Sequence, residues 1–491
     1  MKRFFSVNSN YGKLILLVGL LVAVPALVVP FYPEEARYLP GFLVPSAVSV
    51  ALGIAVSIFA PRQEKPMTEW LSPIQRGSLP VMLAWCFAFF LGAVPFAVSG
   101  QLTFILSLFE SVSGWTTTGL TVVDVTAMPR IFLFHRSFMQ YCGGLGFIIM
   151  IAMLVKGKQN MTLYSAEGHS DRIMPSLKKT ARAIFLLYSF FLVVGTLAYR
   201  LFGMELFDAL CHTMSALSTA GFTTQAGSIG HYQSLPIEII TILLMLVGAT
   251  NFAILLLFIK RKFRKIIHIS EVRFMIGLIA VFTPLAAFSL MRNTGLRFGE
   301  SVINALFGVV TTFTTTGYSI MNYSLWPPFA LGLLMMLMVI GGSGGSTAGG
   351  IKLYRTYLLI RITRENIRNR LSPMRRTSAP SYTRVQGKML ISDALIKSVV
   401  GFVVCYIGVL IAGTLLLTLT SGSSLFDAMF EFASALGTVG ISNGLTNAGA
   451  SAGSLIVLMI GMILGRLEVF IVFIGAYAGI QALVKKVRKY S

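Results

Sequence analysis

The chain has 491 residues, of which 55% are hydrophobic and only 12% charged, and its mean hydropathy is +0.78. A soluble domain of this length needs more charged surface, so the composition excludes the ordinary soluble classes and favours a membrane protein. The formal net charge of +22 would suit a nucleic-acid-binding protein. We expect no nucleic-acid partner, because the basic residues are concentrated in alternate connectors between apolar segments.

Apolar runs of about 20 residues, the length that crosses a bilayer, follow one another along the chain. Lysine and arginine gather at the N-terminus, in every second connector and in the C-terminal tail. This positive-inside pattern predicts that both termini are cytoplasmic and that basic connectors face anionic membrane lipid. We predict ten transmembrane helices, at about 14–32, 41–60, 79–99, 137–155, 183–199, 239–259, 274–291, 328–351, 398–420 and 452–484.

From the third run onward, the chain repeats one pattern four times. An apolar segment is followed by a short amphipathic stretch, a Thr-x-Gly sequence, a polar loop and a second apolar segment. The amphipathic stretches, about 12–14 residues long, are too short to cross a bilayer, so we expect half-helices that enter and return. The glycine-containing copies read SVSGWTTTGLT at 111–121, SALSTAGFT at 215–223, VVTTFTTTGYS at 309–319 and SALGTVGIS at 434–442.

This repetition predicts an all-α polytopic membrane protein with four pseudo-symmetric membrane–pore–membrane repeats around one pore, preceded by an added pair of helices. We assign the N-terminal pair to residues 1–65, and the four repeats to 66–160, 161–265, 266–388 and 389–491.

The four Thr-x-Gly sequences, called the filter loops below, suit a dehydrated potassium ion. Rings of backbone carbonyls replace the water that such an ion gives up. Glycine allows the unusual dihedral angles that turn carbonyls inward, and each half-helix directs its negative end toward the pore. Close helix packing by small residues is the alternative explanation for any single copy. We predict that K⁺ is held by the backbone carbonyls of Thr117, Thr118, Gly119, Thr219, Ala220, Gly221, Thr315, Thr316, Gly317, Thr438, Val439 and Gly440.

A glycine-rich segment, called the gate loop below, interrupts the second apolar run of the third repeat. Six glycines in ten residues do not hold a regular helix, since each costs about 1 kcal/mol relative to alanine. An unwound segment at this depth must line the pore or be buried against it. The segment does not match a phosphate-binding loop, because the Gly-Lys-Ser/Thr sequence that such a loop requires is absent here. A hydrolase nucleophile at Ser343 and simple helix packing remain alternatives. The loop consists of Gly341, Gly342, Ser343, Gly344, Gly345, Ser346, Thr347, Ala348, Gly349 and Gly350.

Arg466 lies deep within the last apolar run, where a charge is expensive and usually functional. Our hypothesis is that Arg466 faces the cavity below the filter, meets the gate loop and opposes cation flow. An ion pair with Glu468, or with an acid of another helix, is the structural alternative. We expect Arg136 and Gln140 to tie the start of their helix to carbonyls of a neighbouring half-helix, and Asp124 to lie at the outer mouth of the pore.

Three further motifs make the chain similar to the bacterial Trk and Ktr potassium transporter subunits over nearly its whole length. They are RSFMQYCGGLG at 136–146, GGSGGSTAGGIKLYR at 341–355 and GRLEVF at 465–470. The resemblance implies a homodimer in the bacterial cytoplasmic (inner) membrane, whose gate loop obstructs conduction until a separate cytosolic regulatory ring protein acts on it. Any nucleotide is expected on that partner. The resemblance also links glycine at all four filter positions to potassium rather than sodium.

The sequence thus predicts potassium uptake by a gated channel rather than an enzyme, with K⁺ as the transported ion and no organic cofactor in this chain. A symporter coupled to sodium or protons is the main alternative. The apolar runs carry few acids that could relay protons, which favours the channel.

Overall fold

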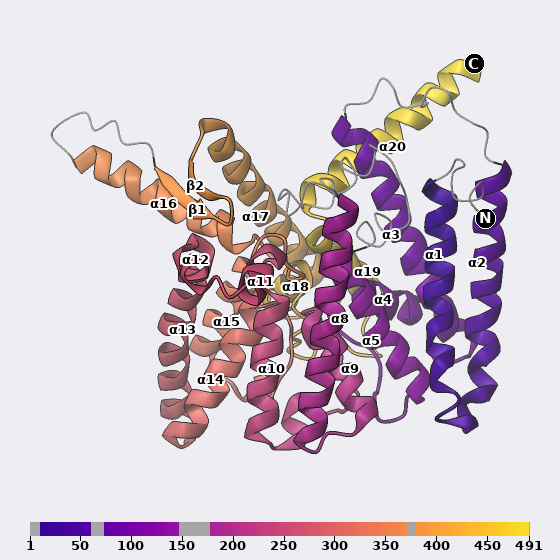
Figure 1. Cartoon of the computed structure of the whole chain (residues 1–491), viewed down its shortest axis with the longest axis horizontal. Coiled ribbons are helices and arrows are strands. Elements are labelled where there is room, and N and C mark those ends of the chain that lie inside the picture. The colour runs from indigo at the N-terminus through magenta and orange to yellow at the C-terminus, as the bar shows by residue number, and fades with distance from the viewer. Residues whose placement is uncertain (1–9, 60–72, 147–176, 372–379, 491) are drawn as a thin grey trace.

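The computed structural model describes residues 10–59, 73–146, 177–371 and 380–490, and these are almost entirely helical (Figure 1). The N-terminal pair is α1 (Asn10–Ala23) and α2 (Leu39–Phe59), joined by the 3₁₀ turns η1 (Val24–Val28) and η2 (Pro33–Tyr38). The two helices approach closely through small residues. The hydroxyl of Ser46 donates to the carbonyl of Gly19 at 2.7 Å, the kind of contact that holds helices together in lipid.

After this pair, one order of helices recurs four times in the described residues: a long helix, a short buried helix and a second helix, which is interrupted in the last three sets. The first set is α3 (Pro73–Val98), α4 (Phe104–Trp115) and α5 (Arg130–Leu145). The second is α8 (Leu177–Leu201), α9 (Leu206–Leu217), α10 (Leu235–Gly248) and α11 (Phe252–Ile259). The third is α13 (Ser270–Thr294), α14 (Phe298–Phe313), α15 (Pro328–Ile340) and α16 (Leu353–Leu371). The fourth is α17 (Asp393–Ser421), α18 (Leu425–Leu436), α19 (Ala452–Arg466) and α20 (Val469–Tyr490).

Short pieces complete the fold: the 3₁₀ turns η3 (Ser228–Tyr232) and η4 (Tyr323–Leu325), and helix α12 (Phe263–His268) between the second and third sets. The start of α1 and the end of α20 lie toward the same side of the molecule (Figure 1). The predicted repeat boundaries at 65–66 and 160–161 lie outside the described residues, the one at 265–266 falls within α12, and the one at 388–389 falls in the connector before α17.

The long first helices carry the lipid-facing surface. Within the described ranges, five helices are long and apolar enough to cross a membrane, or up to seven if each bent pair is one span; α8, α13 and α17 are among the five. On α17, Val404, Ile411 and Leu419 are exposed by 67%, 57% and 81%. Such a band of exposed aliphatic side chains is stable only against lipid tails or another apolar surface. The short helices α4, α9, α14 and α18 are instead buried at their C-terminal ends, toward the centre of the bundle.

The predicted spans need corrections wherever the second helices are interrupted. The span predicted at 239–259 is two helices, α10 and α11, bent by 114°, and the span at 452–484 is α19 and a second helix bent by 104°. The span at 328–351 is helical only to Ile340. Helix α5 ends at Leu145, and the rest of the span at 137–155 lies outside the described residues. The total of ten spans therefore stays a prediction.

The helical fold confirms the all-α expectation, and one small hairpin adds to it. Strands β1 (Ser381–Arg384) and β2 (Gly387–Leu390) form an antiparallel hairpin in the connector before α17, with Ser381 opposite Leu390. Tyr382 and Ile391 pack there with Leu358 of α16 in a small separate core. Periodicity does not reveal strands of four residues, because they are too short to establish an alternating pattern.

Candidate functional site

The four filter loops have the same backbone conformation. The threonine that opens each Thr-x-Gly sequence has a left-handed φ, between 52° and 57°, at Thr117, Thr219, Thr315 and Thr438. A left-handed residue with a β-branched side chain is strained, and such strain persists only where surrounding structure imposes it. The filter glycines have φ between 73° and 92°. Four copies of one unfavourable conformation indicate a common geometric task.

The loops meet one another in cyclic order. A Cβ atom added to Gly119 would lie under 3.0 Å, closer than real Cβ atoms approach, from the carbonyl oxygen of Ala220 in the second loop. The corresponding clashes join Gly221 to Thr316, Gly317 to Val439 and Gly440 back to Thr118. Each glycine therefore lies directly against a carbonyl of the next loop, and the fourth loop closes on the first. The absence of four side chains is what allows the ring to be this narrow.

Hydrogen bonds behind the ring hold the loops in place. The hydroxyl of Ser113 donates to the carbonyl of Leu120 at 2.6 Å and accepts from the N–H of Gly119 at 3.1 Å. Tyr318 of the third loop lies 3.1 Å from the carbonyl of His212 and 3.2 Å from that of Phe222, in the second repeat. The carbonyls of Leu120 and Phe222, which follow two of the filter glycines, are thus engaged in hydrogen bonds within the protein.

Arg136 and Gln140 brace the filter from the middle of α5, which begins at Arg130, rather than from the start of that helix. Arg136 forms an ion pair with Glu110 at 2.5 Å, and the two side chains are 1% and 0% exposed. Gln140 donates to the carbonyl of Ala220 at 2.8 Å and accepts from the N–H of Phe222 at 3.2 Å. Their contacts therefore go to filter-loop residues as well as to the half-helix acid, a correction to the predicted ties to half-helix carbonyls.

The gate loop lies directly against one side of the ring. The N–H of Gly349 donates to the hydroxyl of Thr315 at 2.8 Å, and the hydroxyl of Thr347 lies 3.0 Å from that of Thr219. A Cβ on Gly349 would lie under 3.0 Å from the hydroxyl oxygen of Thr438. Three of the four filter threonines are thus in contact with this loop.

Backbone contacts fix the position of the gate loop. Gly341 and Gly350 both have left-handed φ and pack on each other, so the segment closes on itself as a compact loop. The N–H of Ser343 donates to the carbonyl of Ala249 at 3.1 Å, and the amide of Asn251 donates to the carbonyl of Gly344 at 2.5 Å. Both partners lie at the bend between α10 and α11. The two interruptions support each other, because each supplies hydrogen-bond partners that an unwound backbone in the membrane requires.

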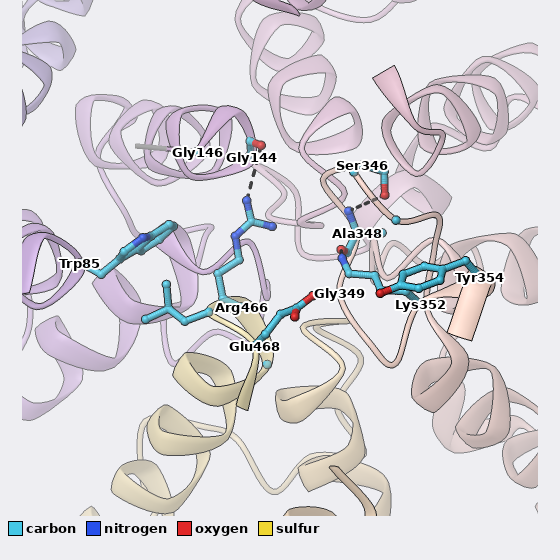
Figure 2. A pocket seen from close by; sticks show the side chains of 14 residues that line it. Trp85, Gly144, Gly146, Ser346, Ala348, Gly349, Lys352, Tyr354, Arg466 and Glu468 are labelled. Atoms are coloured by element: carbon cyan, nitrogen blue, oxygen red, sulfur yellow. Dashed lines mark hydrogen bonds between the residues drawn. The ribbon is translucent and has the colours of Figure 1, made fainter. Parts of the chain in front are cut away.

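Arg466 bridges the gate loop and the end of α5. Its guanidinium donates to the carbonyl of Thr347 at 2.6 Å and to that of Gly143 at 2.5 Å. Figure 2 shows the side chain extended between these two segments, with Glu468 below it. The carboxylate of Glu468 accepts from Arg355 at 2.9 Å.

A cavity beside the gate loop is lined by two basic residues and one acid. Lys352 follows the loop with a left-handed φ of 83°, and its ammonium group donates to the carbonyl of Ala348 (Figure 2). Lys352 and Arg466 line the cavity with Glu468, and Arg355 pairs with that carboxylate. Sequence reasoning missed Lys352 and Arg355. The sequence feature that could have revealed these two residues is their position. Both follow a glycine-rich break in an apolar run, where charge is costly.

The structure gives no support to a hydrolase at Ser343. Of the histidines in the described ranges, His135 bonds the carbonyl of Gly92, and His212 bonds Asp208 and Thr223, so both rings are engaged elsewhere. His268 likewise contacts the carbonyl of Arg264, and His231 packs on Tyr232. His169 lies outside the described residues.

Asp124 lies in the exposed loop that follows the first filter. Its carboxylate accepts from the hydroxyl of Thr126 at 2.6 Å and from the N–H of the same residue at 3.0 Å. These hydrogen bonds lower the pKa of the Asp124 carboxyl, so it is charged at neutral pH.

Comparison with known proteins gives one consistent result. The family model TrkH, described as "Cation transport protein", matches residues 47–478. The Trk system potassium uptake protein TrkG of Escherichia coli (strain K12) is 30% identical over 486 residues, covering 95% of this chain and 96% of that protein. TrkH of Halomonas elongata is 28% identical over 478 residues, covering 94% and 96%. The crystal structure of the potassium transporter TrkH from Vibrio parahaemolyticus superposes with a TM-score of 0.81 at 28% identity, covering 95% of this chain and 98% of that one.

Proposed function

The chain belongs to the TrkH family of cation transport proteins, and from this premise we propose that it takes up potassium through a pore formed by its four filter loops and obstructed by its gate loop. It is a multi-pass membrane protein and a transporter rather than an enzyme, in keeping with relatives that are named as potassium uptake proteins.

One observation carries the proposal: the cyclic contact of the four loops. Each filter glycine abuts a carbonyl of the next loop, and the order closes after four steps. A closed ring of backbone oxygens at the C-terminal ends of four buried half-helices suits an ion that must be stripped of water. Glycines that served only to pack helices would have no reason to form such a ring.

The gate loop and the charges beside it give the pore a closed state. The loop contacts Thr219, Thr315 and the region of Thr438, so an ion leaving the ring on that side meets backbone rather than water. Lys352 and Arg466 add positive charge at the same level. Conduction then requires movement of the loop, with Arg466 losing its bond to Thr347.

The test is cation flux in vesicles that contain the purified protein. We expect the parent protein to pass potassium in preference to sodium. Gly→Ser substitution at 119, 221, 317 or 440 should lower that preference, because the new side chain meets a carbonyl of the next loop at a strained φ. A Gly277→Ser variant is the matched control, since a Cβ at Gly277 meets nothing within 4 Å. Equal potassium and sodium flux in the parent, or four variants that behave like the control, would overturn the proposal.

The same vesicles distinguish a channel from a symporter. A reversal potential that follows the potassium gradient alone supports the channel. A reversal potential that shifts with external pH or sodium supports coupling and replaces the gated-pore part of the proposal.

We further propose that a cytosolic, nucleotide-binding ring protein opens the gate, and that the transporter works as a homodimer in the bacterial cytoplasmic membrane with both termini inside the cell. The exposed basic surface of α12, with Lys262, Arg264 and Lys265, and the basic helix α16 supply a docking surface. Helix α16 continues directly from the gate loop, so a force on it reaches the gate. Co-purification of a nucleotide-binding partner, lost when these cations are replaced by glutamine, tests the docking; the mass of the detergent complex tests the dimer.

A further inference from the structure

A side chain nine residues before the filter glycine braces three of the four loops in the same way. In each case this side chain bonds the hydroxyl of the residue two positions after the glycine. The bond joins the extended segment that leaves the filter to the half-helix that enters the filter. The pairs are Glu110 with Thr121 at 3.0 Å, His212 with Thr223 at 3.0 Å, and Glu431 with Ser442 at 2.8 Å.

The third loop is held differently. Its equivalent position is Gly308, and the indole of Trp326 occupies the place where a side chain would lie. The N–H of Ser319 instead donates to the hydroxyl of Ser228, from the second repeat, at 3.2 Å. The contact that holds the segment after the filter glycine is therefore structural. It is supplied by a carboxylate, by an imidazole or by a neighbouring loop.

The charge of the brace is what differs between repeats. Glu110 is neutralised by Arg136, with both side chains buried. His212 brings no carboxylate: its Nδ1 lies 2.8 Å from the carbonyl of Asp208, and its Nε2 lies 3.0 Å from the hydroxyl of Thr223, which itself donates to the carbonyl of Gln225.

Glu431 has no such compensation. It is 0% exposed, and its carboxylate accepts only from neutral groups. These are the hydroxyls of Ser442 and Thr446 and the N–H groups of Asn443, at 3.0 Å, and Thr446, at 3.1 Å. In the part of the chain that the structure describes, no lysine or arginine forms an ion pair with it. Four hydrogen bonds stabilise a buried carboxylate in its charged form without cancelling its charge.

Two other acids near the filter are placed differently. Asp208 and Asp427 lie in the first turns of α9 and α18, where the positive end of each helix offsets a negative charge. Glu431 lies in the middle of α18, beyond the reach of that effect.

We propose that Glu431 is a positioning residue that also sets the cation affinity of the filter, by supplying uncompensated negative charge behind the fourth loop. The inference rests on the proposed function, since it concerns the ion held by that ring. A unit charge acting over about 10 Å, at an effective permittivity of about 20, changes a binding constant about tenfold. The charge also makes the filter electrically asymmetric, with its negative side at the fourth repeat.

The experiment measures the external potassium concentration that gives half-maximal uptake in vesicles, at constant membrane potential. Glu431→Gln should raise this concentration about tenfold, and Glu431→Asp, which keeps the charge, should restore it. His212→Gln is the matched control for the brace, because it exchanges one neutral group for another at the equivalent position. The His212→Gln variant is expected to lower the maximal rate of uptake and to leave the half-saturating potassium concentration unchanged.

The reverse change is His212→Glu, which adds a carboxylate where the first and fourth repeats already carry one. It should lower the half-saturating concentration. Equal shifts in Glu431→Gln and His212→Gln, or no shift in Glu431→Gln, overturn the inference. If Glu431→Gln does not reach the membrane, His212→Glu becomes the deciding variant. A half-saturating potassium concentration that is unchanged or raised in His212→Glu overturns the inference. Absence of potassium uptake by the parent protein would contradict the proposed function instead.

Discussion

At the scale of single residues, the filter depends on backbone conformations that most side chains avoid. Thr117, Thr219, Thr315 and Thr438 are left-handed, although threonine is among the residues least suited to that region. At Thr219 and Thr315 the hydroxyl gives a reason for threonine, since both hydroxyls contact the gate loop. A glycine would adopt the same φ at lower cost but would give the gate nothing to bind.

Arg466 is the residue whose removal should change conduction most directly. Arg466→Ala deletes a positive charge beside the gate loop and two hydrogen bonds, to Thr347 and Gly143. We expect the basal potassium flux of the variant to be about ten times that of the parent protein. The reason is that the positive charge and the hydrogen bond that holds the gate loop are both lost. Flux in vesicles without any partner protein is the measurement.

Arg466→Lys is the control for this variant, since it keeps the charge and loses the forked geometry. Its flux should stay close to that of the parent. Unchanged conduction in a well-expressed Arg466→Ala protein would show that the arginine is structural, as in the alternative of an ion pair.

At the scale of elements, the second helix is interrupted in the second, third and fourth sets, and α5 of the first set ends at Leu145. Helix α10 ends at Gly248, α15 at Ile340 and α19 at Arg466. The breaks satisfy one another: Ala249 bonds the gate loop, and Arg466 joins that loop to the end of α5. Each unwound end alone would leave polar backbone groups in the membrane, but together they pair.

The gate loop should respond to added volume at its contact with the ring. In Gly349→Ala, the new Cβ would lie under 3.0 Å from the carbonyl oxygen of Gly437 and the hydroxyl of Thr438. Since backbone cannot easily yield, we expect the loop to move away, with a severalfold rise in basal potassium flux and a lower temperature of unfolding. Both are measured on the purified protein.

Gly332→Ala provides the comparison for the gate-loop variant. Gly332 lies in α15 of the same repeat, and a Cβ there meets nothing within 4 Å. It should keep parental flux and gain slightly in helix stability. Low flux in Gly349→Ala at parental stability would mean that the loop is not the obstruction.

At the scale of the whole molecule, a buried carboxylate is among the contacts that join the N-terminal pair to the pore bundle. Glu35 of η2, 6% exposed, accepts from the N–H groups of Arg130 and Ile131, both at 2.6 Å. These are the first residues of α5, so Glu35 caps that helix from another element and faces its positive end.

Glu35→Gln should therefore destabilise the folded protein by about 1–2 kcal/mol without altering ion preference, since the cap lies apart from the ring. The temperature of unfolding in detergent and the potassium-to-sodium flux ratio are the two measurements. Glu34→Gln, one residue away and exposed, should leave both unchanged. A changed flux ratio in Glu35→Gln would indicate that the N-terminal pair acts on the filter.

The sequence alone determined the class, the family, the repeated order of helices and the places where glycine-centred turns break the helices, because these depend on local features: apolar length, helix breaking by glycine and a motif present four times. Tertiary structure decided what depends on contacts between distant segments. The cyclic packing of Gly119 on Ala220 and its three counterparts, and the bends of α10 and α19, have no local signal. The carboxylates show this most clearly: Glu110 and Glu431 occupy equivalent positions in sequence, yet only the folded chain brings Arg136 to one and leaves the other with neutral donors. Charge compensation acts through space, and spacing along the chain does not record it.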